Sequence, residues 1–252
     1  FFFKQKTAYE IPKRDWSSDV CSSDLEGHIT DFIGTFEKRA PGPQAFMVEQ
    51  DPLWVTPPHF HVENQFQLVV GGAGAIGRHA VAPYTVHYAA RETGYGPITA
   101  GPEGIVYLTL RAEGDTGAWY LHKPGVRERM QPGLRREQHH GTPSSHARPD
   151  ELLRLQTASA ETLIAPRADG LAAWMLRVPP HHPVTLPPQP AHGGRHVVVT
   201  AGSALFDGRN LDALSVAFIT HDDPTLPTSG AGGAEIIVMQ FPVNSTSLET
   251  PQ

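Results

Sequence analysis

Short apolar runs separated by glycine or proline dominate the chain. They lie at residues 45–48, 65–70, 75–79, 85–89 and 105–111 in the first half, and at residues 171–178, 196–200, 215–219 and 235–241 in the second half. Runs of this length, bounded by turn residues and rich in Val, Ile, Tyr and Phe, predict β-strands. A short helical turn is expected only at residues 150–155. The pattern therefore predicts an all-β protein with two groups of strands.

A stretch without apolar periodicity separates the two groups. Residues 123–149 are rich in proline and serine and contain the paired histidines His139 and His140, which we expect to face solvent. We predict a first domain over residues 26–122, a linker over residues 123–160 and a second domain over residues 161–245. A glycine-rich turn precedes the last strand of each half, which favours a tandem repeat.

Residues 1–25 are excluded from this reasoning because they resemble the translation of a sequencing-library adapter, and we interpret them as an assembly artefact. They contain Cys21, the single cysteine of the chain. The remainder can form no disulfide and offers no thiolate ligand, so we expect a reducing, cytoplasmic location. The native start, and with it a signal peptide, could have been lost.

The charge balance predicts no nucleic-acid partner. Lys and Arg total 20 while Asp and Glu total 26, which gives a net charge of −6 at pH 7. Arginines are interspersed with glutamates, so there is no basic stripe. No apolar run reaches the roughly 20 residues that a membrane-spanning helix needs. The expected partner is a small molecule.

Candidate chemistry lies in the segment Pro-His-Phe-His-Val-Glu-Asn-Gln at residues 58–65. Alternate residues of a strand share a face, so His59 and His61 would project together. Gln65 keeps this parity and its amide oxygen could supply a third, neutral ligand, while Glu63 is an anionic competitor. Neutral imidazoles bind divalent transition metals. The segment therefore predicts one metal site, with Fe, Mn, Ni, Cu and Zn as the candidate ions.

This segment resembles the first motif of the cupins. In that motif a glutamate follows the His-x-His pair, and six further residues separate it from a glycine; here Gln65 and Gly72 hold those places. The resemblance implies a barrel whose interior binds a metal ion. The glutamine departs from the usual anionic ligand.

The second cupin motif is matched at its glycine and proline positions but not at its polar positions. Gly96, Pro102 and Gly104 fall on it, but Tyr107 stands where the motif has histidine and Arg111 where it has asparagine. His87, between the two motifs, is the nearest substitute for the missing fourth ligand. The predicted metal ligands and candidate pocket residues are therefore His59, His61, Gln65 and His87, with Glu63, Tyr95 and Tyr107.

The resemblance extends to the second half through the repeat and implies two tandem cupin-type jelly-roll barrels, a bicupin. The second half has no His-x-His pair, and His192 and His196 lack a third partner at useful spacing. We expect the second barrel to be metal-free and structural. A homodimer would cover the face that bears Phe60 and Val62, which would otherwise leave an apolar patch.

Our first hypothesis is a mononuclear metal-dependent enzyme that acts on a small molecule, with oxygenase chemistry ahead of isomerase chemistry. The alternative is a non-catalytic bicupin that binds a small ligand or is purely structural. The neutral Gln65 and the absence of a histidine at Tyr107 favour that alternative.

Overall fold

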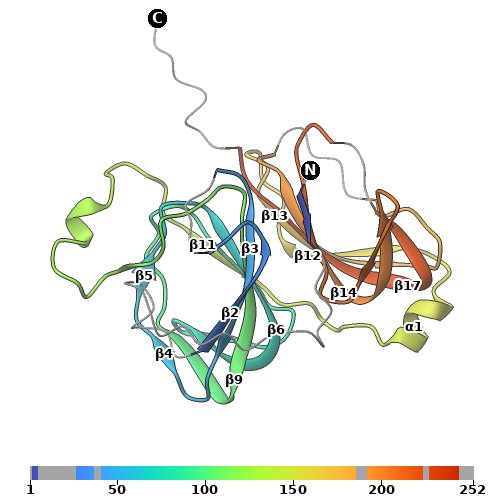
Figure 1. The fold of residues 1–252 in the computed structure, drawn as a ribbon, viewed down its shortest axis with the longest axis horizontal. Coiled ribbons are helices and arrows are strands. Elements are labelled where there is room, and N and C mark those ends of the chain that lie inside the picture. Colours follow the sequence, from blue (N-terminus) through green and yellow to red (C-terminus); the bar gives the residue numbers. More distant parts are fainter. Residues whose placement is uncertain (1, 5–26, 37–40, 186–191, 224–226, 244–252) are drawn as a thin grey trace, which may run out of the picture. The chain divides into compact units, whose positions relative to one another are not determined.

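The computed structural model describes residues 2–4, 27–36, 41–185, 192–223 and 227–243 (Figure 1). Within these ranges nearly all regular structure is β, apart from the helix α1 (Pro149–Arg154) and a 3-10 turn at Arg127–Arg129. The described residues divide into two units: residues 27–144 belong to the first, and residues 2–4 together with residues 145–243 belong to the second. Among the described helices there is none long and apolar enough to cross a bilayer.

The first unit is built on an eight-stranded antiparallel sheet. Its strands run in the order β11-β8-β6-β9-β3-β2, with β4 paired to β9 and β7 paired to β6. A separate ladder joins two short strands, β5 and β10. The bounds are β2 (Gly27–Ile33), β3 (Gln44–Gln50), β4 (Val55–Thr56), β5 (His59–Phe60), β6 (Gln65–Ile76), β7 (His79–Val81), β8 (Val86–Ala89), β9 (Ile98–Arg111), β10 (Trp119–Tyr120) and β11 (Gln138–Gly141).

The second unit repeats this pairing scheme. Its strand order is β1-β16-β14-β17-β13-β12, with β15 paired to β14. The long pair β14·β17 corresponds to β6·β9 of the first unit, and each long pair carries two register shifts. The bounds are β1 (Phe2–Lys4), β12 (Ser159–Ile164), β13 (Ala172–Val178), β14 (Arg195–Phe206), β15 (Arg209–Asp212), β16 (Val216–Ile219) and β17 (Thr228–Gln240).

Equivalent glycines make the bends of the two long pairs. Gly72 has φ +61° and Gly202 has φ +70°, a region that side chains other than glycine rarely adopt. A Cβ at Gly72 would lie 2.3 Å from the carbonyl oxygen of Gly104, and one at Gly202 would lie 2.2 Å from that of Gly233. The same close backbone approach therefore recurs in both halves, as the tandem repeat predicts.

Three local expectations differ from the structure. Residues 75–79 are not one strand, because Gly77 and Arg78 form the turn between β6 and β7. The expected linker contains β11, which pairs with β8 and belongs to the first unit. Of the segment interpreted as artefact, residues 2–4 form β1 against β16, and the remainder lies outside the described residues.

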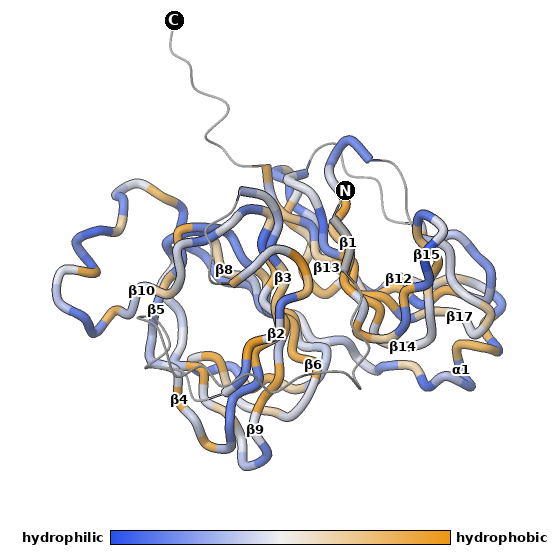
Figure 2. Tube along the Cα trace, viewed as in Figure 1, coloured by the Kyte–Doolittle hydropathy of each residue, from blue (hydrophilic) through white to orange (hydrophobic). Residues whose placement is uncertain are grey.

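The two interiors differ in polarity. In the second unit the inward side chains form a continuous apolar cluster that includes Trp174, Leu176, Val197 and Ile236, all at most 2% exposed. The first unit has a smaller apolar cluster around Phe46. Apolar residues concentrate along the strands of each unit (Figure 2). The polar interior positions of the first unit are those that build the site.

Candidate functional site

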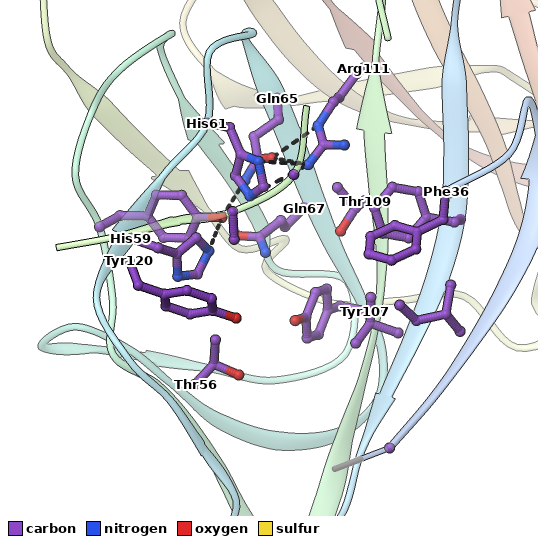
Figure 3. Close-up of a pocket in the computed structure, with 17 residues that line it drawn as sticks. Phe36, Thr56, His59, His61, Gln65, Gln67, Tyr107, Thr109, Arg111 and Tyr120 are labelled. Carbon is purple, nitrogen blue, oxygen red and sulfur yellow. Dashed lines mark hydrogen bonds between the residues drawn. The ribbon is translucent and has the colours of Figure 1, made fainter. Parts of the chain in front are cut away.

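A cavity of about 130 Å³ lies inside the first barrel (Figure 3). One wall is apolar and comes from β2 and β3, through Ile29, Phe46 and Val48. The opposite wall is polar and includes three of the predicted metal ligands, namely His59, His61 and Gln65. A space of this size holds several water molecules or a small organic molecule.

His59 is held by both its main chain and its ring. Its backbone exchanges two hydrogen bonds with Tyr95, at 3.0 and 2.9 Å. The ring donates from Nδ1 to the Pro57 carbonyl at 2.8 Å, and Nε2 accepts from the Tyr95 hydroxyl at 2.8 Å. Burial, together with the neighbouring His61 and Arg111, lowers the pKa of His59 to about 3. The ring is therefore neutral at physiological pH, with its lone pair on Nε2.

His61 is oriented by Asp115. Its Nδ1 donates to the Asp115 carboxylate at 2.7 Å, and the same carboxylate accepts the backbone N–H groups of Val62, Glu63 and Gly117 at 2.8–3.2 Å. Burial raises the pKa of Asp115, but the charges and hydrogen bonds around it prevail and hold that pKa below its usual range. Burial also lowers the pKa of His61. Asp115 is thus an anion that fixes the ring of His61.

Arg111 lies at the centre of the polar wall and is only 2% exposed. Its Nε and Nη2 donate to the amide oxygen of Gln65 at 3.2 and 3.0 Å, and its Nη1 donates to Gln44 at 3.1 Å. Nη2 also lies 3.1 and 3.4 Å from the two ring nitrogens of His61 and 3.9 Å from the Asp115 carboxylate. Burial lowers the pKa of Arg111, but a guanidinium keeps its proton in proteins. Arg111 and Asp115 are therefore a buried ion pair.

Tyr95 and Tyr107, both predicted as pocket residues, line the cavity. The Tyr95 hydroxyl accepts from the Gln65 amide at 2.5 Å and donates to His59. The Tyr107 hydroxyl accepts from Gln50 at 3.3 Å. Burial raises the pKa of both tyrosines, so both hydroxyls keep their protons. Glu63, the third predicted pocket residue, is not among the lining residues.

His87 lies behind the polar wall, not in it. It stands opposite Gln67 in the β6·β8 pairing, with Nδ1 2.8 Å from the Gln67 oxygen and Nε2 3.2 Å from the Gln138 oxygen. Its ring stacks on His140 at 4.6 Å, and His140 stacks on His79 at 4.0 Å. His140, expected to face solvent, thus has both ring nitrogens buried within β11. Burial, then the neighbouring His140, lowers the pKa of His87 to about 3.

These contacts test whether the chain fits a four-ligand metal centre. The Nδ1 contacts of His59 and His61 fit, because an acceptor at Nδ1 is usual for metal-bound histidines. Their Nε2 atoms are already in contact with donors, since that of His59 accepts from the Tyr95 hydroxyl and that of His61 lies 3.4 Å from Nη2 of Arg111. Gln65 does not fit, since its oxygen accepts two bonds from a buried cation. Both nitrogens of His87 face amide oxygens. Within the described ranges there is no group of three or more His, Cys, Asp or Glu that could hold a metal ion. The four-ligand set does not fit this arrangement.

The histidines of the second barrel serve other contacts. His196 is fully buried and packs against Phe218 and Phe241 at ring distances of 4.8 and 5.9 Å. His192 accepts from the backbone of Gly194 at 3.1 Å and contacts Arg195. Phe60 is likewise covered within its own chain, since it stacks on Trp119 at 6.1 Å and is 1% exposed. It therefore leaves no apolar patch that a second subunit must cover, and the homodimer stays a prediction.

Comparison with known proteins identifies the fold. No protein-family model and no curated protein matches the sequence. A candidate dioxygenase of Nostoc punctiforme is 12% identical, with a TM-score of 0.56 over 90% of this chain and 78% of that chain. Oxalate decarboxylase of Bacillus subtilis, solved in a study of its Mn(II) centres, is 14% identical, with a TM-score of 0.51 over 96% and 80%. The protein has an all-β fold of two tandem cupin-type jelly-roll barrels.

Proposed function

We propose that the first barrel is a small-molecule-binding domain whose ligand occupies the interior cavity and is held there by hydrogen bonds, without a metal ion. The observation that carries this proposal is the buried guanidinium of Arg111, which engages the oxygen of Gln65 and contacts the ring of His61. A second cation beside it would meet a neutral ligand set and a like charge.

The shape and rigidity of the cavity support binding. An apolar wall faces a few polar groups, which is the usual composition of ligand pockets. Hydrogen bonds that the rings of His59 and His61 donate to Pro57 and Asp115 fix both rings, so little side-chain freedom is left to lose when a ligand enters. The apolar packing of the second barrel gives it the role of a scaffold.

A second candidate function is a metal-dependent oxygenase that uses the same cavity. The favouring observation is that His59 and His61 both direct Nδ1–H to an acceptor, as metal-bound histidines usually do. A divalent transition metal at the two Nε2 atoms would have to displace the Tyr95 hydroxyl from His59. Such an ion, when bound, supplies Lewis-acid or dioxygen chemistry. The fold is shared with a candidate dioxygenase and with a decarboxylase that has Mn(II) centres.

Elemental analysis separates the two candidates. Protein purified without added metal should hold clearly less than one Fe, Mn, Ni, Cu or Zn per chain, and dialysis against a chelator should not change its Tm. A resident metal at a hundredfold excess over its Kd would contribute about 2.7 kcal/mol, which is several degrees in Tm. Stoichiometric metal that disappears in a His59→Ala, His61→Ala double variant, but not in His221→Ala at an exposed ion pair, would favour the oxygenase.

Binding itself is tested by closing the cavity. Ala118 lines the cavity and is partly exposed, so Ala118→Trp should fill it with little strain on the barrel. We expect that small molecules detected by ligand-observed NMR on the wild type no longer bind the variant, while its circular dichroism spectrum stays the same. Hits that bind both proteins equally would contradict a ligand site in this cavity.

A further inference from the structure

The polar wall presents hydrogen-bond donors and positive charge to the cavity, and we propose that the ligand is a small carboxylate whose oxygen atoms accept bonds from Gln67 and Tyr107. This inference rests on the proposed function, because it names the chemical class that the cavity selects. It gives His87 the part of a positioning residue.

Gln67 is the first donor. It belongs to β6, and its amide oxygen lies 2.8 Å from Nδ1 of His87. The two ends of an amide point apart, so the –NH2 group is turned away from His87. Figure 3 shows this nitrogen facing the space between His59 and Tyr107. An –NH2 group can only donate, which favours a ligand that accepts.

His87 decides which end of the Gln67 amide meets the ligand. A neutral imidazole has one N–H, and both of its nitrogens lie near amide oxygens, at 2.8 Å on the Gln67 side and 3.2 Å on the Gln138 side. With the proton on Nδ1, Gln67 must turn its oxygen to His87 and its –NH2 to the cavity. With the proton on Nε2, the amide would reverse and present an acceptor. The shorter contact, on the Gln67 side, favours the Nδ1–H tautomer and hence a donor surface.

Tyr107 is the second donor. Its oxygen accepts from the Gln50 amide at 3.3 Å, and that same amide also donates to Thr56 at 2.5 Å. The hydroxyl proton can therefore be donated toward the cavity, where the Tyr107 hydroxyl points at that of Tyr120 from the opposite side (Figure 3).

The charge of Arg111 favours carboxylates among the ligands that accept hydrogen bonds. Arg111 lines the cavity, but its counter-ion Asp115 does not. The Asp115 carboxylate is turned to His61 and to backbone N–H groups, and its side chain is fully buried. A molecule in the cavity thus lies nearer the guanidinium than the carboxylate, so an anion is favoured over a cation in this low-dielectric space.

The test compares two probes with four carbons each, 2-oxobutanoate and sec-butylamine, by isothermal titration calorimetry. The wild type should bind the acid at least tenfold more tightly than the amine. Gln67→Glu keeps an oxygen for His87 but replaces the donor with a second acceptor, so acid binding should fall at least tenfold. Gln156→Glu adds the same charge at an exposed residue of the other unit and should leave binding unchanged.

The positioning role of His87 has its own readout. His87→Gln retains an N–H donor toward Gln67 and should keep the preference for the acid, whereas His87→Leu should reduce that preference even when the variant is fully folded. Tyr107→Phe should weaken acid binding and leave amine binding unchanged. A merely structural His87 would change stability in both variants without changing the acid-to-amine ratio.

Three results would overturn the inference: tighter binding of the amine, no binding of either probe to the wild type, or unchanged acid binding in Gln67→Glu. None of them decides the proposed function. If other small molecules bind the wild type and not Ala118→Trp, the cavity is a ligand site of a different class; if none do, the proposed function fails as well.

Discussion

Replacement of Arg111 by methionine is expected to lower the free energy of unfolding of the first barrel by about 3–5 kcal/mol, the usual cost of removing one partner from a buried ion pair. Methionine keeps much of the apolar stem but removes the charge that faces Asp115 at 3.9 Å. It also leaves the amide oxygen of Gln65 without its donors and removes one of the two donors to the amide oxygen of Gln44. Urea unfolding followed by tryptophan fluorescence and circular dichroism measures the loss.

The control for this variant is an arginine in an exposed ion pair. Arg148 is 70% exposed beside Asp150 and Glu151, so Arg148→Met should cost less than about 1 kcal/mol. A double variant, Arg111→Met with Asp115→Asn, should recover part of the loss because no unpaired charge is then buried. If Arg111→Met and Arg148→Met unfold at the same urea concentration, the guanidinium of Arg111 does not stabilise the first barrel as a buried ion pair.

Acidification from pH 7 to pH 5 is expected to remove about 2 kcal/mol of stability for each of His59 and His87. Burial lowers the pKa of both to about 3 from 6.5. The unfolded chain therefore takes up protons near pH 6.5, whereas the folded barrel resists protonation until much lower pH. The stabilisation is fully present above pH 6.5 and is lost progressively as the pH falls toward 3. Urea midpoints measured at several pH values give the slope.

Substitution of one histidine at a time assigns the slope to these rings. His87→Gln removes one buried imidazole and should reduce the pH dependence by about half of the combined 4 kcal/mol at pH 5. His221→Gln, at a residue whose side chain is 63% exposed, should leave the slope as it is. A wild type with the same stability at pH 7 and pH 5 would contradict the neutral, buried state of both rings.

The sequence predicts the strands that carry regular apolar runs and misses those stabilised mainly by their neighbours. β6, β9, β14 and β17 have long apolar segments that indicate strands directly. In contrast, β11 has the sequence Gln-His-His-Gly and is a strand only because it pairs with β8. Strand formation depends on cross-strand packing as much as on intrinsic preference, so such elements carry no local signal.

The candidate site is predictable to the same extent. His59, His61 and Gln65 line one interior cavity, but the expected continuous strand that would give them a common parity is absent, because β5 ends at Phe60 and β6 begins at Gln65. In the sequence, Arg111 is noted only because it stands where the second cupin motif has asparagine. No sequence pattern predicts that it is buried. Asp115 lies 54 residues from His61 and gives no sequence signal, because their contact depends on how the chain turns after β9. His87 lies next to the site, but the alternation of side chains along a strand cannot distinguish a residue that lines the cavity from one that packs behind the polar wall.

The main-chain bridge between His59 and Tyr95 has a consequence for how this barrel can change. The two hydrogen bonds join backbone peptide groups, so they do not depend on which side chain stands at either position. Replacement of the side chain of His59 or Tyr95 would change the polar groups in the cavity, while the backbone of the barrel keeps its structure. The side chains at these two positions can therefore be replaced one at a time without loss of the main-chain hydrogen bonds that join them.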